Sequence, residues 1–114
     1  MKNYRVLLHI DELAKSDLVL GNARNLLLDL GKEQVETEIL INHEAVYLCI
    51  RTPNRWADQI MELSKKGVRF AVCSNAMRAF GVTKDLLLDT IEPVSSGMGE
   101  ITQKQKEGFL YIQP

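Results

Sequence analysis

The stretch VRFAVCSNAM, residues 68–77, decides the fold and contains the candidate reactive residue. Its first part is apolar and rich in β-branched side chains, which indicates a buried strand that ends at Cys73. Ser74 and Asn75 follow directly, and small polar residues of this kind favour the start of a helix. Backbone N–H groups and the helix dipole stabilise a thiolate at such a position. We therefore expect any covalent chemistry of this protein to involve Cys73.

Strands and helices are predicted to alternate on both sides of this stretch. Apolar runs predict further strands at Tyr4–Ile10, Val35–Ile41, Ile91–Val94 and residues 109–112. Helical periodicity and breaker residues predict helices at residues 16–30, 54–66, 74–81 and 98–107. Residues 45–50 fit a short strand or a short helix, and we favour the helix because Glu44 and Ala45 are poor strand starters. Connections long enough for crossovers then indicate an α/β fold with a parallel sheet and helices on both faces.

The composition is ordinary for one globular domain spanning residues 1–114. Hydrophobic residues make up 46% of the chain, charged residues make up 25%, and the net charge is −1. This balance gives no electrostatic footprint for nucleic acid or an anionic membrane, so we expect neither as a partner. No apolar run resembles a membrane span or a signal peptide, and Cys49 and Cys73 lack metal-site spacing. We predict a cytoplasmic protein with reduced thiols.

The candidate site follows from the predicted parallel sheet. In such sheets, ligands bind beyond the carboxyl ends of the strands. The residues that follow the four strands are, in chain order, His9, Asp11 and Glu12, then Asn42, His43 and Glu44, then Cys73, Ser74 and Asn75, and finally Ser95, Ser96 and Gly97. Nearby helix N-termini would supply backbone N–H donors for an anion. We therefore expect these residues to converge on one edge of the sheet.

Each candidate also has an alternative explanation. Cys73 is either a nucleophile or persulfide carrier, or a small buried core residue. His43 is either a proton donor or acceptor, or an exposed loop residue. The turn at Ser96 and Gly97 either binds an anion through its amides or begins a helix with a capping serine. Cys49 lies in an apolar segment and is expected in the core. No ligand spacing predicts a metal site, and no nucleotide-binding glycine pattern is complete.

Segments spread along the chain carry a resemblance to a known family. They are VRFAVCSNAMRAFG at residues 68–81, DLL at residues 85–87 followed by EPVSSG at residues 92–97, and QKEGFLYIQP at residues 105–114. Together with the amino-terminal strand, these segments resemble the DsrE/DsrF-like sulfur-relay family over essentially the whole chain. The local sequence after Cys73 is similar to the stand-alone branch of that family rather than to its dedicated relay subunits.

This resemblance implies more than the residue patterns alone. It implies a flavodoxin-like three-layer sandwich with a mainly parallel sheet of about five strands. It also implies homotrimers or homohexamers with sites near subunit interfaces. Cys73 takes the position of the family's cysteine, which carries sulfur as a persulfide in some members.

Our leading hypothesis is a small cytoplasmic sulfur-handling protein that carries sulfane sulfur as a persulfide on Cys73. The residues expected to contact the bound group are Ser74, Asn75, His43, Ser96 and Gly97. The expected partners are further copies of this chain and sulfur donor and acceptor proteins, with no metal and no cofactor. This is carrier chemistry, so an enzymatic turnover is left open. The alternative is a non-catalytic oligomeric binding or assembly module in which Cys73 lines a pocket or an interface.

Overall fold

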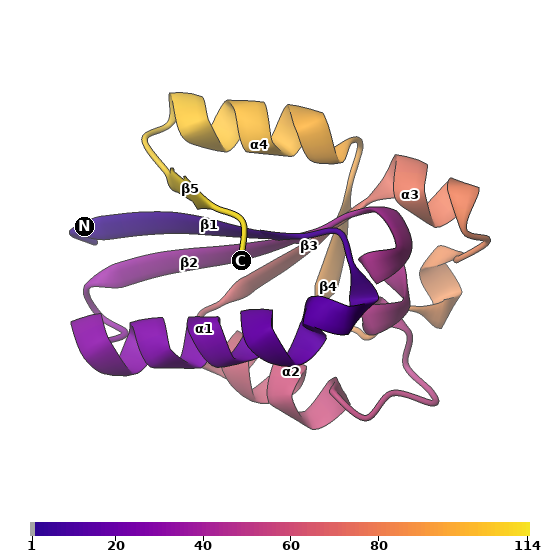
Figure 1. The fold of residues 1–114 in the computed structure, drawn as a ribbon, viewed down its shortest axis with the longest axis horizontal. Coiled ribbons are helices and arrows are strands. Elements are labelled where there is room, and N and C mark those ends of the chain that lie inside the picture. The colour runs from indigo at the N-terminus through magenta and orange to yellow at the C-terminus, as the bar shows by residue number, and fades with distance from the viewer. Residues whose placement is uncertain (1) are drawn as a thin grey trace.

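Five parallel strands form a single sheet at the centre of the structure, a computed structural model that describes residues 2–114 (Figure 1). The strands are β1 (Tyr4–Ile10), β2 (Val35–Ile41), β3 (Arg69–Cys73), β4 (Ile91–Val94) and β5 (Leu110–Ile112). Their order across the sheet is β4-β3-β2-β1-β5, and every neighbouring pair is parallel. The prediction of an α/β fold with a parallel sheet of about five strands is confirmed.

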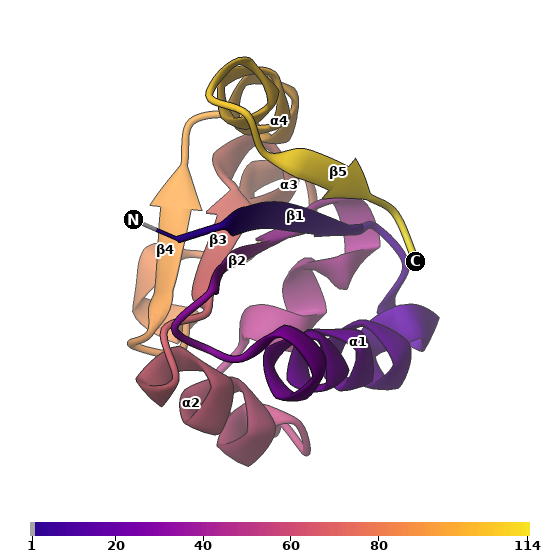
Figure 2. The same cartoon turned by 90° about the vertical axis from the view of Figure 1, so that its left-hand side faces the viewer.

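Helices cover both faces of this sheet and make the three-layer sandwich. The α-helices are α1 (Ser16–Leu30), α2 (Ala57–Lys65), α3 (Ser74–Ala79) and α4 (Gly97–Lys106). Figure 2 shows α1 and α2 below the sheet and α4 above it. Short 3-10 helices occupy Leu13–Lys15, His43–Cys49 and Lys84–Leu86.

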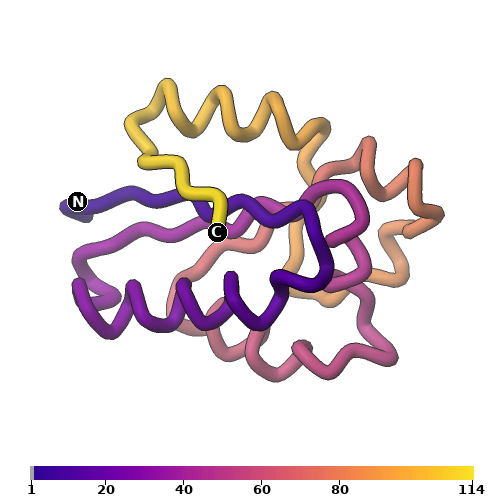
Figure 3. The backbone as a smooth tube through the Cα atoms, viewed as in Figure 1, coloured from indigo at the N-terminus to yellow at the C-terminus, as the bar shows by residue number. Residues whose placement is uncertain are grey.

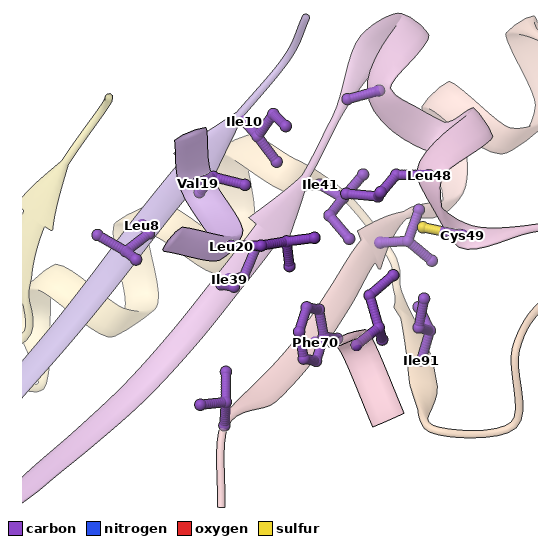
Figure 4. Close-up of a cluster of buried hydrophobic side chains, with 14 of the residues drawn as sticks. Leu8, Ile10, Val19, Leu20, Ile39, Ile41, Leu48, Cys49, Phe70 and Ile91 are labelled. Carbon is purple, nitrogen blue, oxygen red and sulfur yellow. The ribbon is translucent and has the colours of Figure 1, made fainter. Parts of the chain in front are cut away.

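Alternating side chains of the strands build a separate apolar cluster on each face. The larger cluster lies against α1 and α2 and includes Ile10, Ile39 and Phe70 (Figure 4). The smaller cluster lies under α4 and includes Leu7 and Leu40. Because both faces are buried, β1 and β3 are largely apolar, whereas β2 is apolar in its second half and carries Glu36 and Glu38 in its first half. These two clusters hold the strands in register, so the turns that leave β1, β2 and β3 lie at one end of the sheet (Figure 3).

Two predicted boundaries differ from the structure for a local reason. The helix predicted over residues 54–66 begins at Ala57, because Asn54 organises the preceding turn instead of capping the helix. Its Nδ2 donates to the carbonyls of Leu48 and Ile50, each at 2.7 Å, and its Oδ1 accepts from the Trp56 N–H at 2.8 Å. Residues 45–50, for which a short helix was favoured over a short strand, lie in the 3-10 helix His43–Cys49 except for Ile50. Ile50 forms an isolated antiparallel bridge with Leu87.

Candidate functional site

Cys73 stands at the junction of β3 and α3, as the sequence predicts. It is the N-cap residue of α3 and has extended backbone angles. Its Sγ accepts a hydrogen bond from the Ala76 N–H at 3.4 Å. A thiol thus takes the place that serine or aspartate usually fills at a helix start. The contact orients the sulfur toward backbone N–H groups that stabilise negative charge.

The Cys73 side chain is nearly covered. It is 5% exposed and belongs to the larger apolar cluster, together with Ala76 and Met77 from α3. Both alternatives for Cys73 therefore retain support from the geometry. The sulfur has a polar partner, yet most of its surroundings are apolar.

Asn42 and Gly97 complete the immediate surroundings of Cys73. A methyl group built on Gly97 would lie 3.0 Å from Asn42 Nδ2 and 3.5 Å from Cys73 Cβ. The end of β2, the end of β3 and the first turn of α4 therefore meet at one point. A larger residue at this position would be in ordinary contact with Cys73 and would require the Asn42 side chain to shift by a few tenths of an ångström. Asn42 was expected at this edge of the sheet because it directly follows the second strand, but it was not among the residues predicted to contact the bound group.

Ser96 acts as the N-cap of α4. Its Oγ accepts a hydrogen bond from the Gly99 N–H at 2.8 Å. The hydroxyl oxygen therefore caps the helix, while its O–H can still donate to an anion beside the backbone amides at the start of α4. The capping alternative of the sequence prediction and the anion-binding alternative are thus compatible at this turn.

The remaining predicted residues lie at the same edge but face other neighbours. Asn75 is exposed in the first turn of α3 and accepts a hydrogen bond from Arg78, while Ser74 is half-buried beside it. His43 is exposed, has a φ of 54° and packs edge-on against Phe80, with ring centroids 5.1 Å apart. A positive φ is uncommon for a residue other than glycine, and the aromatic contact helps to hold it.

His9 belongs to a separate polar contact at the end of β1. Its Nδ1 lies 2.7 Å from the Tyr111 hydroxyl, and only 6% of the residue is exposed. Burial lowers the pKa of His9, and the nearby Asp11 carboxylate opposes this effect. The structure therefore places a neutral, hydrogen-bonded histidine here.

The described part of the chain contains neither a clustered set of metal ligands nor a helix suited to span a membrane. Among residues 2–114, no group of three or more His, Cys, Asp or Glu side chains is arranged to hold a metal ion. None of the helices described for residues 2–114 has both the length and the apolar character needed to cross a membrane.

Comparisons with known proteins extend these observations. The sequence profile of the DsrE/DsrF-like family matches residues 10–114. One similar solved structure is that of MTH1491 from Methanobacterium thermoautotrophicum, described as a protein of unknown function. Its sequence is 40% identical to this chain, and the two structures superpose with a TM-score of 0.90 over 97% of this chain and 99% of that chain. The ychN protein from E. coli is 13% identical, with a TM-score of 0.75 and full coverage of both chains. BT1422 from Bacteroides thetaiotaomicron is 17% identical, with a TM-score of 0.76 over 98% of this chain and 96% of that one. The last two likenesses show the fold, and a comparison with curated proteins found no match.

Proposed function

Because the chain belongs to the DsrE/DsrF-like family, we propose that it handles sulfur and carries a sulfane sulfur as a persulfide on Cys73. The observation that carries the proposal is the position of the Cys73 sulfur at the start of α3. There the Ala76 N–H donates to it, and the first turn of α4 begins beside it. Backbone N–H groups at this point can donate hydrogen bonds to a sulfur that carries negative charge.

The proposed cycle needs no oxidant. The Cys73 thiolate attacks the terminal sulfur of a donor persulfide, so that a Cys73 S–S bond forms and the donor S–S bond breaks. The donor leaves as a thiolate, and Cys73 holds the persulfide anion. A nucleophile of the acceptor protein then attacks the terminal sulfur. This step breaks the Cys73 S–S bond and returns the Cys73 thiolate.

Cys49 does not offer the same chemistry. It is fully buried in the 3-10 helix His43–Cys49, and burial raises the pKa of its thiol far above the ordinary value. A thiol that stays protonated is a poor nucleophile, because the thiolate is the attacking species. Cys49 therefore serves as the internal control for Cys73.

The groups around Cys73 have distinct roles in this proposal. Backbone amides at the starts of α3 and α4 would stabilise the terminal sulfur. Ser74 and Asn75 are the first residues of α3, and Gly97 is the first residue of α4. His43 would contact a partner protein at the edge of the site, because its ring is exposed and packs against Phe80. Ser96 would act by fixing the first turn of α4 through its cap.

A second function is favoured by the cover over Cys73. With 5% exposure, Cys73 also suits a binding or assembly module in which the thiol only packs against neighbours. In that case, copies of the chain associate through their surfaces, and Cys73 carries no sulfur.

Mass spectrometry after incubation with a small-molecule persulfide donor distinguishes the two functions. The wild-type protein and Cys49→Ala should gain the mass of one sulfur atom at Cys73, and Cys73→Ala should gain none. The gained sulfur should then leave when a thiol acceptor is added. An unmodified Cys73 across several donors and pH values, in protein whose circular dichroism is native, would refute the carrier function and favour the module.

A further inference from the structure

A solvent-open groove lies between α1 and α2, on the face of the sheet opposite α4 (Figure 2). Two adjoining cavities of about 210 and 280 Å³ form it, and Arg24 and Lys66 border both of them. Its lining residues come from the second half of α1, from residues 59–63 of α2 and from the residues just after each helix. These helix ends lie at the amino ends of the strands, whereas Cys73 lies at the carboxyl end of β3 (Figure 1).

The groove has an apolar wall that is partly open to solvent. Leu27 contributes a buried portion of this wall, and Leu28 contributes an exposed portion. Leu28 is 76% exposed, the highest value among the large apolar side chains of residues 2–114. A partner that covers this side chain therefore gains nearly all of the stabilisation that burying a leucine provides.

Positive charge borders this wall. Arg24 and Lys32 line the groove without forming an ion pair within residues 2–114. Lys66 pairs at 3.7 Å with Glu62, the one acidic residue that lines the two cavities. The whole chain has a net charge of −1, so this excess of cations is local. Unpaired cations beside an apolar wall are complementary to a ligand with carboxylates and an apolar side chain.

We propose that this groove docks an acidic, leucine-bearing segment of a partner protein. Carboxylates of the segment pair with Arg24 and Lys32, and an apolar side chain of the segment lies on Leu28. A peptide fits better than a small molecule, because pockets for small molecules bury most of the ligand, whereas both cavities of this groove are open to solvent. A partner docked in this way leaves the edge of the sheet at Cys73 uncovered.

Fluorescence anisotropy with two synthetic peptides tests the docking. The probe is a fluorescein-labelled peptide of alternating glutamate pairs and leucine pairs, and the control peptide has serine in place of each leucine. The groove variants are Leu28→Ser and Lys32→Glu. Their matched controls are Leu18→Ser, at a 51% exposed leucine of the same helix, and Lys106→Glu, at an exposed lysine of α4. All four positions are exposed, so the variants should fold.

The proposal expects saturable binding of the leucine probe, weakened at least about fivefold by each groove variant and by less than about twofold by each control variant. In a nitrogen-15 NMR titration, the amide shifts should concentrate in residues 24–32 and 59–66. Equal binding of the serine peptide would show attraction by charge alone and overturn the proposal. So would equal losses in groove and control variants, shifts centred on Cys73, or no saturable binding below about 1 mM. Wild-type protein that binds phosphatidylglycerol vesicles in preference to the probe would assign the groove to a membrane surface and also overturn it.

Discussion

Replacement of Glu38 by glutamine should remove a loss of stability that the wild-type protein shows as the pH rises. Glu38 lies in the middle of β2 under α4 and is 2% exposed. Burial raises the pKa of its carboxyl group to about 8, and a hydrogen bond and charge repulsion from Glu100 on α4 act in the same direction. Arg69 and Lys104 oppose this shift, because their charged nitrogens lie 3.7 and 3.8 Å from Glu38 Oε1.

The sign of the pH dependence follows from where the proton is held. The folded protein keeps the Glu38 proton up to about pH 8, whereas the unfolded chain releases it near the ordinary pKa of 4.5. Between these values the folded state binds more protons, so the free energy of unfolding falls as the pH rises. A difference of one bound proton corresponds to about 1.4 kcal/mol per pH unit. With partial titration near the upper value included, the loss between about pH 6 and about pH 8 is about 2 kcal/mol for this group.

Urea denaturation of the wild type and of Glu38→Gln at these two pH values measures the effect. Glutamine has the shape and the donor capacity of the protonated carboxyl group, but it cannot ionise. The variant should therefore lack the loss of about 2 kcal/mol. Glu36→Gln is the matched control, because Glu36 is exposed on the same strand and pairs with Arg5 at 3.3 Å. Parallel pH dependences in the wild type and Glu38→Gln would refute the reasoning.

Four further predictions concern the surroundings of Cys73, a glycine of α1 and the open edge of the sheet. Gly97→Ala should lower the free energy of unfolding by about 1 kcal/mol and slow sulfur loading of Cys73, because its methyl group would lie 3.0 Å from Asn42 Nδ2. Gly21→Ala, which meets only the end of a flexible side chain at 3.7 Å, should stabilise the protein by about 0.5–1 kcal/mol in the same urea assay. Ser96→Ala should cost about 1 kcal/mol through loss of the cap of α4, and a stability equal to that of the wild type would refute the capping role. We also propose that the protein forms homotrimers or homohexamers. Leu110 is 59% exposed on β5, the strand at one open edge of the sheet. Leu110→Asp should therefore shift the mass measured by light scattering toward that of the monomer. A wild type that scatters as a monomer at all concentrations would contradict the association itself.

The fold was predictable because its signals are local. Each strand has an apolar run long enough to be recognised, and the breakers between the runs mark the helix ends. The start of α2 was the exception, since the side chain of Asn54 bonds to carbonyls that precede it as well as to the N–H of Trp56. A capping residue and a turn-forming residue look alike in a sequence, and only the position of the partner carbonyls separates them.

The surroundings of the candidate site were less predictable because they depend on contacts between distant segments. The sequence places Cys73 at a helix start, but the approach of Gly97 and Asn42 depends on how α4 crosses the end of the sheet. The burial of Glu38 has the same origin. Alternation along β2 predicts which face it occupies, whereas the cover comes from α4, more than fifty residues later in the chain.

The burial of Cys73 has two opposite consequences for the proposed cycle. A thiol that is 5% exposed is protected from oxidation, because the oxidation of cysteine follows its exposure. The same cover blocks a donor, so the loading step requires an element beside Cys73 to yield. Displacement of α3 would break the Ala76 N–H contact that orients the sulfur. Displacement of the first turn of α4, which approaches Cys73 at Gly97, would leave that contact intact. Access from the side of α4 would therefore keep the thiol oriented during the proposed transfer.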